Sequence, residues 1–247
     1  MSFDRLHYEF RLLGRKVVLL PMLVMGGLSL LALLFSYLKF IAPERFLLGG
    51  IEMILPLTVG MIIGNVVIED PALELQLTMP CRYDRTAMQR LALIMSWTAG
   101  IAVLSSLIFS LFHLAYIPAL LRAWSPFASS LLMQLVWLAP LVWCMGIGFC
   151  LTLLTRSWTG SAALLGSIWI VQIAFKNVIA LTAWLRPVLL FPTTLFIYDF
   201  PDLSPANFTT YWLDTRLEVV ATGVVLLLLG WFLLHKTERL LKGMNVA

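Results

Sequence analysis

Charged side chains are scarce in this 247-residue chain. Asp, Glu, Lys and Arg make up 12% of the residues, whereas they make up about 25% of a typical soluble domain. Hydrophobic residues account for 61% of the chain, and its mean hydropathy is +0.94. This composition leaves little room for a soluble domain, so we expect residues 1–247 to form a single integral membrane domain.

Cysteine, histidine and nucleotide-binding motifs are also scarce or missing. The three cysteines, Cys81, Cys144 and Cys150, are odd in number and lack paired spacing, which argues against a disulfide framework or a metal site. No histidine and glutamate pair has metal-ligand spacing. The sequence contains no Gly-x-x-x-x-Gly-Lys-Ser/Thr phosphate-binding loop. We therefore expect no metal bound by this chain and no ATP hydrolysis by it.

Long apolar segments are the dominant feature of the sequence. Their hydrophobic residues run continuously instead of alternating, which indicates helices and not strands. Each segment is near the roughly 20 residues that a helix needs to cross a bilayer. We predict an all-α membrane protein with six spans, at residues 17–38, 51–68, 91–112, 129–154, 161–183 and 217–235.

Basic residues set the expected orientation. The net charge of +4 is scattered over short loops, which favours orientation signals over a nucleic-acid-binding patch. Six spans place both termini on one side, and that side has more lysine and arginine: Arg5, Arg11, Arg15, Lys16, Arg82, Arg85, Arg90, Arg156, Lys236, Arg239 and Lys242. The other side has Lys39, Arg45, Arg122, Arg186 and Arg216. We expect cytoplasmic termini in a plasma membrane of the bacterial inner-membrane type.

Residues 1–16 have the pattern of an amphipathic helix. Apolar side chains recur at spacings of three and four, at Phe3, Leu6, Phe10, Leu13 and Val17. Charged residues occupy the other faces, so the segment is suited to lie in the cytoplasmic interface of the membrane. The alternative is a charged flank that only sets orientation.

Residues 69–90 form the longest charged stretch between two predicted spans. Asp70 suits an N-cap and Pro71 suits the first position of a helix. Leu73 and Leu77 are one turn apart, and Pro80 ends the predicted helix. A short cytoplasmic helix with an apolar stripe suits insertion into a groove on a partner protein. The alternative is a solvated connector whose charges only fix topology.

The layout of the chain resembles the membrane subunit of a type-2 ABC exporter. That family has an N-terminal interfacial helix, six spans, and a loop after the second span that carries an acidic pair, a Leu-Glu-Leu core, a proline and basic residues. Pro71 and Ala72 stand where the family often has Gly-Thr. The resemblance rests on these loop residues: Glu69, Asp70, Leu73, Glu74, Leu75, Pro80, Arg82 and Arg85. Leu77 belongs to the expected contact with the partner through the apolar stripe.

The resemblance implies a mechanism and a set of partners. In the family this loop is a coupling helix, which docks in a cleft of a separate ATPase subunit. The implied assembly has two membrane subunits, identical or related, and two ATPase subunits that bind ATP and Mg²⁺. This chain would then be a transport subunit and not an enzyme, with no cofactor of its own.

Residues 184–216 are too apolar for a free loop and too rich in proline for a span. They contain Pro187, Pro192, Pro201 and Pro205 among large apolar residues. In the resembling family, short re-entrant helices precede the last span on the outer side. We expect the same here, since irregular backbone is tolerated at membrane depth only where protein or water covers it. A simple surface loop is the alternative.

Polar residues within or near the predicted spans are candidates for a transport pathway. Gln172, Lys176 and Asn177 fall in the outer half of the fifth span, where Gln172 and Lys176 share a helix face. Glu52 begins the second span and is a candidate partner for Lys176. Intramembrane charges usually face protein or water. The alternative for Lys176 is an interfacial anchor whose stem lies along the helix.

Gly60 and Gly64 form a Gly-x-x-x-Gly pair in the second predicted span. Small residues at this spacing allow two helices to approach closely. We interpret the pair as a packing feature of the membrane domain and not as a functional site.

The preferred function is export of an amphiphile, such as a lipid, a peptide or a hydrophobic drug, driven by a separate ATPase. Two other classes stay open. An intramembrane enzyme needs a nucleophile with a base at membrane depth, and Thr159, Gly160 and Ser161 do not match the Gly-x-Ser-Gly pattern of intramembrane serine proteases. A membrane scaffold or sensor without transport activity is the third class.

Overall fold

The computed structural model describes residues 14–38, 43–68, 83–111, 125–195 and 205–244. Regular structure in these ranges is helical and includes no strand, which confirms the predicted all-α class. The elements are α2 (Gly14–Tyr37), α3 (Pro43–Gly49), the π-helical turn η1 (Gly50–Ile54), α4 (Leu55–Ile68), α6 (Tyr83–Leu111), α7 (Pro126–Thr155), α8 (Trp158–Ala174), α9 (Lys176–Leu181), the 3₁₀ helix η3 (Ala183–Val188), α10 (Pro192–Leu195) and α11 (Pro205–Met244).

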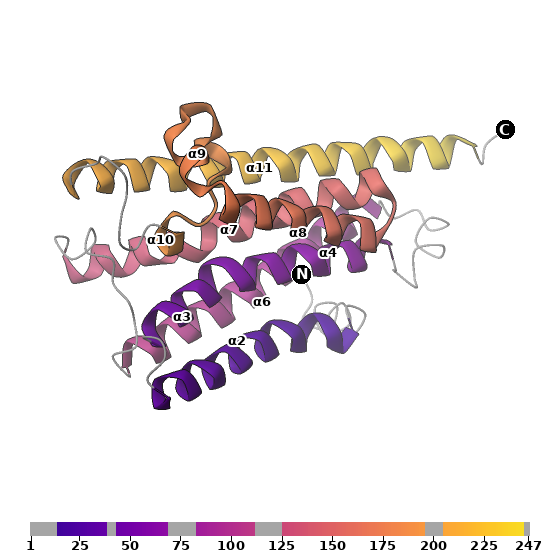
Figure 1. Ribbon diagram of the computed structural model, residues 1–247. Coiled ribbons are helices and arrows are strands. Elements are labelled where there is room, and N and C mark those ends of the chain that lie inside the picture. The colour runs from indigo at the N-terminus through magenta and orange to yellow at the C-terminus, as the bar shows by residue number, and fades with distance from the viewer. Residues whose placement is uncertain (1–13, 39–42, 69–82, 112–124, 196–204, 245–247) are drawn as a thin grey trace.

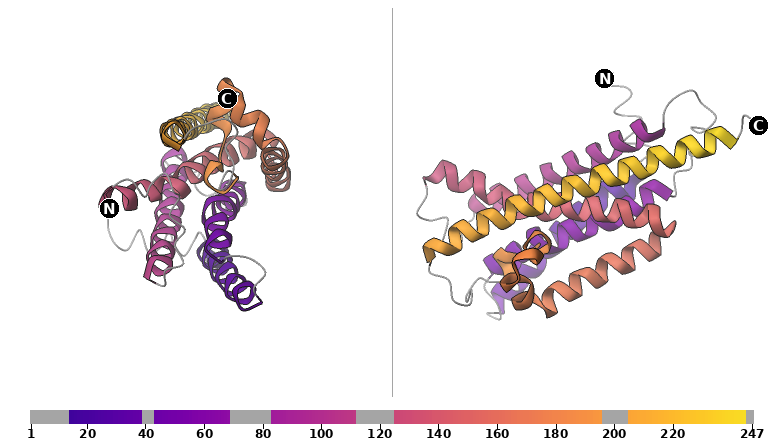
Figure 2. Two further views of the ribbon diagram at one scale, coloured as in Figure 1. Left: turned by 60° about the vertical axis from the view of Figure 1, so that its left-hand side comes forward. Right: turned by 90° about the horizontal axis from the view of Figure 1, so that it is seen from above.

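Five helical stretches are long and apolar enough to cross a membrane, which supports the membrane-protein class. They are Val17–Tyr37, Pro43–Gly64, Arg85–Leu111, Phe127–Thr155 and Thr210–Lys236. Helix α8 is a shorter apolar helix of 17 residues. The long helices lie side by side, with α2 and α11 at opposite edges in the view of Figure 1 and the same alignment in Figure 2.

The predicted fifth span, residues 161–183, is not one continuous helix. Helix α8 ends at Ala174, Phe175 leaves helical geometry with φ −111° and ψ 24°, and α9 begins at Lys176. Apolar residues continue through this break, so the hydropathy pattern did not predict it. Lys176 therefore starts a new helix instead of continuing the helix that carries Gln172.

The last helix starts earlier than predicted. Helix α11 begins at Pro205 instead of residue 217, so residues 205–216 of the predicted outer segment belong to it. Asp214, Arg216 and Glu218 interrupt the hydropathy signal there although the backbone is helical. The irregular part of the predicted segment is correspondingly shorter.

Serine caps set the ends of the α7–α8 hairpin. Ser125 accepts a hydrogen bond from the Ala128 N–H at 3.3 Å, with Pro126 in the first helical position. Ser157 caps α8 by accepting from the Gly160 N–H at 3.2 Å. Between the helices, Arg156 adopts the left-handed conformation with φ 50°. The chain thus reverses over two residues, which packs α8 back against α7.

Helix α7 is the centre of the bundle, and glycines bring its neighbours close. Its membrane-length window is 78% buried, whereas the windows of α2 and α11 are 28% and 22% buried. A Cβ placed on Gly60 of α4 would lie 2.8 Å from the Cys144 carbonyl oxygen of α7, and one on Gly64 would lie 2.9 Å from the Thr152 hydroxyl. On the opposite side, a Cβ on Gly223 of α11 would lie 2.8 Å from the backbone nitrogen of Trp143.

Several sequence predictions fall outside the described residues. Residues 1–13 of the predicted interfacial helix lie there, as do residues 69–82 of the predicted coupling loop. From the loop that resembles a coupling helix, only the part that follows residue 82 is described. It forms the start of α6, where Arg85 is exposed.

Candidate functional site

A broken segment between α8 and α11 is the most unusual part of the described structure. We call residues 175–195 the connector; it contains α9, η3 and α10 (Figure 1). Pro187 lies within η3 and Pro192 begins α10, so this stretch does not form one continuous α-helix. Residues 189–191 between these two helices are non-helical and almost completely buried. Buried backbone of this kind must find hydrogen-bond partners within the protein.

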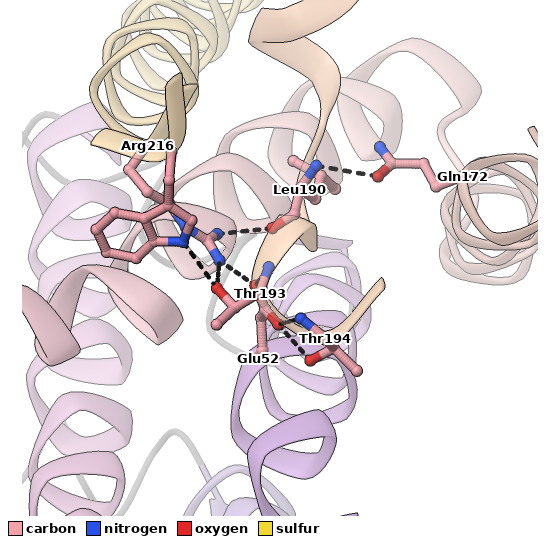
Figure 3. Close-up of polar contacts among 7 residues, drawn as sticks. Glu52, Gln172, Leu190, Thr193, Thr194 and Arg216 are labelled. Carbon is pink, nitrogen blue, oxygen red and sulfur yellow. Dashed lines mark hydrogen bonds and ion pairs between the residues drawn. The ribbon is translucent and has the colours of Figure 1, made fainter. Parts of the chain in front are cut away.

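A buried ion pair lies at the centre of the connector's contacts. Glu52 of η1 and Arg216 of α11 are both fully buried, and the Arg216 guanidinium bonds the Glu52 carboxylate directly (Figure 3). The sequence pattern predicts only an orientation role for Arg216 and indicates Lys176 as the candidate partner of Glu52. In the structure the ion-pair partner of Glu52 is Arg216.

The Glu52 carboxylate also caps helix α10. It accepts hydrogen bonds from the backbone N–H of Thr193 at 3.1 Å and of Thr194 at 2.6 Å, and from the Thr194 hydroxyl (Figure 3). These N–H groups belong to the first turn of α10, where no intrahelical carbonyl can satisfy them. A negative charge is favourable at this end of a helix. One carboxylate from η1 therefore completes a helix that follows it by about 140 residues in sequence.

Arg216 holds the connector from the opposite side. Its guanidinium donates to the Leu190 carbonyl at 2.8 Å and to the Thr193 hydroxyl at 2.6 Å. The Trp212 indole N–H donates to the same Thr193 hydroxyl at 3.0 Å, and the guanidinium lies 5.5 Å from the Trp212 ring. Charge-assisted hydrogen bonds of this kind offset the cost of removing both charges from water.

The π-helical turn carries Glu52 at its middle. Residues Gly50–Ile54 form this turn, and the Leu55 N–H donates to the Gly50 carbonyl at its end. Such turns are rare, occur mostly as single turns within α-helices, and are frequent at functional sites. Apolar residues surround the carboxylate in sequence, so hydropathy alone gives no signal for the altered helical phase.

Gln172 attaches α8 to the same stretch of connector. Its amide N–H donates to the Val188 carbonyl at 2.5 Å. Its carbonyl oxygen accepts from the Leu190 N–H at 3.0 Å (Figure 3). The side chain is 1% exposed. Gln172 and Glu52, two of the predicted pathway residues, thus meet on one segment, and both bind its backbone.

The other two predicted pathway residues lie on α9. Lys176 is partly buried and donates to the Leu195 carbonyl at 3.1 Å, which ties the start of α9 to the end of α10. Asn177 is exposed. Their positions place them at the edge of the buried network and not within it.

Helix α11 carries a polar stripe that the sequence-based predictions do not include. Tyr211, Thr215, Glu218 and Thr222 recur at spacings of three and four on one face of the helix. Tyr211 donates to the Ala180 carbonyl at 2.8 Å, Thr222 donates to the Pro187 carbonyl at 3.2 Å, and Glu218 pairs with a connector arginine, Arg186, at 3.1 Å. The spacing of these residues is the signal that would have found the stripe.

The network is suited to holding backbone in place. Glu52 and Arg216 bond each other, and the further hydrogen bonds of Glu52, Arg216 and Gln172 are with backbone or hydroxyl groups of the connector. Among the residues that the structure describes, no group of three or more His, Cys, Asp or Glu side chains could hold a metal ion. The hydrogen bonds of Glu52, Gln172 and Arg216 to the connector support a mechanical role for these side chains.

Comparisons of this chain with models of known protein families, with curated proteins and with solved structures give no match.

Proposed function

We propose that this chain is the membrane subunit of an ATP-driven exporter of the type-2 ABC class. The observation that carries the proposal is the connector, a broken helical segment packed onto the apolar helices and held there by Glu52, Gln172 and Arg216. Short re-entrant helices before the last span are a feature of the family that the sequence resembles. The coupling loop and the apolar composition support the same class.

The proposed topology has six crossings with cytoplasmic termini. They are α2, α3 with η1 and α4, α6, α7, α8 with the connector, and α11. Helix α8 has 17 residues, which gives it a length of about 26 Å. That length is slightly less than the roughly 30 Å of a bilayer's hydrocarbon core. The connector would then complete the fifth crossing at the outer side of a bacterial plasma membrane.

The proposed partner is a separate ATPase that binds residues 70–80. This stretch contains the Leu73, Glu74 and Leu75 core and the apolar Leu77, with the acidic pair before it and arginines after it. Two ATPase subunits with bound ATP and Mg²⁺ would act on two membrane subunits. Closure of the ATPase pair would move α4 and α6, the helices on either side of the loop.

The proposed substrate is an amphiphile such as a lipid, a peptide or a hydrophobic drug. Glu52 and Arg216 are fully buried and neutralise each other, so this pair offers no net charge to a passing solute. The low content of charged residues in the chain supports the same preference over an ion or a sugar.

The test is the double variant Glu74→Lys, Leu77→Asp. Inside-out membrane vesicles would be assayed for ATP-dependent movement of a fluorescent phospholipid analogue and of a hydrophobic dye. We expect the double variant to lose transport while the chain still inserts in the membrane, because both substitutions oppose docking. Leu23→Ala on an exposed face of α2 is the control, since its side chain is 66% exposed. Normal transport by the double variant would contradict the assigned docking site.

A further inference from the structure

We infer that Glu52 is a latch, which joins a unit made of the connector and α11 to the helices α3, η1 and α4. Release of this latch would open the protein on the connector side. That the opening serves the release of substrate rests on the proposed function; the latch itself rests on the contacts of the described residues.

The connector and α11 form one unit because many side chains join them. Four α11 residues donate hydrogen bonds to the connector: Tyr211 to Ala180, Trp212 to Thr193, Arg216 to Leu190 and Thr193, and Thr222 to Pro187. Glu218 adds an ion pair with Arg186. These contacts extend from α9 to α10, so movement of the connector away from α11 would break all of them together.

Glu52 makes a different kind of contact, because it comes from another part of the bundle. Its carboxylate binds Thr193 and Thr194 of the connector and Arg216 of α11, so it reaches both parts of the unit. Gln172 also binds the connector, but α8 leads directly into it and lies only 16 to 18 residues away. Glu52 is therefore the polar residue best placed to fix the unit against α3 and α4.

The contact of the Glu52 carboxylate with the connector and α11 is expected to be either fully formed or broken. With the carboxylate in place, the first-turn N–H groups of α10 have an acceptor and the buried Arg216 cation has its counter-charge. Without it, Arg216 is a buried cation with only neutral acceptors, the Leu190 carbonyl and the Thr193 hydroxyl, and the two N–H groups lose their ionised acceptor. Water then becomes a favourable partner for these groups. Loss of the carboxylate should therefore favour a state in which water reaches the connector.

Accessibility of a buried connector residue measures this state directly. Leu189 is 0% exposed, lies between η3 and α10, and its side chain packs against α9. A Leu189→Cys reporter would be placed in the full chain after Cys81→Ser, Cys144→Ala and Cys150→Ala remove the natural thiols. The protein would be held in lipid nanodiscs, so that a hydrophilic maleimide reaches both faces, and the labelling rate would be measured.

We expect Glu52→Gln to raise the labelling rate of this reporter on the order of tenfold or more, as for a minor state that becomes well populated. Glu44→Gln is the matched control, because it is the same substitution eight residues earlier on the same helical run. It should leave the rate unchanged. Equal rates for Glu52→Gln and Glu44→Gln would overturn the latch.

Two further variants separate the latch from loss of folding. A second reporter, Ala102→Cys, is 0% exposed on α6 and should stay unreactive in Glu52→Gln; a parallel rise there would mean general loosening and would overturn the proposal. If Glu52→Gln does not fold, Glu52→Asp keeps the charge on a shorter stem and should raise Leu189→Cys labelling less, but in the same direction. No rise with Glu52→Asp in that case would also overturn it.

The labelling needs no ATPase and no transported compound. A negative result would therefore reject the latch and leave the proposed export function standing. Absence of an ATPase partner would reject the export function and leave the labelling result as a property of the fold.

Discussion

Glu52 and Arg216 are separated by 164 residues in sequence and form a fully buried ion pair between η1 and α11. The pair does more than neutralise two charges, because each partner also binds the connector. Glu52 satisfies the start of α10 and Arg216 satisfies the Leu190 carbonyl that precedes it. The outcome is an irregular segment whose backbone is satisfied by charged side chains from two helices.

The stability of the fold should depend on both members of this pair together. Arg216→Met alone leaves the buried Glu52 carboxylate without its cation, which should lower the free energy of unfolding by about 3–5 kcal/mol. The double variant Glu52→Gln, Arg216→Met should lose much less than the sum of the two single variants. Unfolding of the full chain in mild detergent measures all four proteins. Strictly additive losses would contradict a direct coupling between the two residues.

Gln172 should contribute to stability through both ends of its amide. Gln172→Leu leaves the Val188 carbonyl and the Leu190 N–H without these partners, at a cost of about 1–3 kcal/mol for each unsatisfied group. Ser167→Ala on the exposed face of the same helix is the control and should be nearly neutral. Unfolding measurements on both variants check this. Equal stability of the two would mean that the connector does not need Gln172.

The close approach of α4 and α7 should not tolerate a methyl group at Gly60. The added Cβ would lie 2.7 Å from a Leu165 methyl and 2.8 Å from the Cys144 carbonyl oxygen, which is backbone and cannot turn aside. Gly60→Ala should therefore destabilise by about 1–3 kcal/mol through overpacking. At Gly100, nothing lies within 4 Å of the added atom. Gly100→Ala is the matched control, and an equal loss in both variants would contradict this account of the packing.

A reversible cross-link across the latch should stop transport. A Cβ on Gly49 would lie 3.5 Å from the Thr194 Cγ2 methyl, the position that a cysteine sulfur at 194 could occupy, so a cysteine pair at these positions of α3 and α10 is close enough to test as a cross-link. In the chain without its natural thiols, oxidation of Gly49→Cys, Thr194→Cys should block movement of the fluorescent phospholipid analogue, and a reductant should restore it. In each single-cysteine variant, neither oxidation nor the reductant should change transport. Unchanged transport by the cross-linked protein would show that this contact stays closed during transport.

The amino-acid pattern predicted the class of the protein better than its details. Continuous apolar runs located the long helices because lipid-spanning length and hydropathy are local properties. The helix break at Phe175 was not predicted, because apolar residues continue on both sides of it. The early start of α11 was not predicted, because Asp214, Arg216 and Glu218 lower the hydropathy there to a value typical of a loop. Their charges are accommodated by tertiary contacts that no local pattern shows.

The sequence predicted some residues of the candidate site and not others. Glu52 and Gln172 stood out as polar residues within apolar runs, and the structure brings both to the connector. Arg216 was assigned to orientation because its partner is remote in the chain. The π-helical turn Gly50–Ile54 contains Glu52. The residue types in this turn do not distinguish it from an ordinary α-helix, so the sequence did not predict it.

If a separate ATPase drives this chain, the two proteins should purify together. The tagged full chain would be isolated in mild detergent from native membranes in which its neighbouring proteins are expressed, and the proteins bound to it would be identified. We predict a stoichiometric ABC-type ATPase that is lost when residues 70–80 are scrambled and retained when Leu23→Ala is introduced instead. A chain that purifies alone under these conditions would rule out the proposed ATPase partner and would favour an intramembrane enzyme or a scaffold.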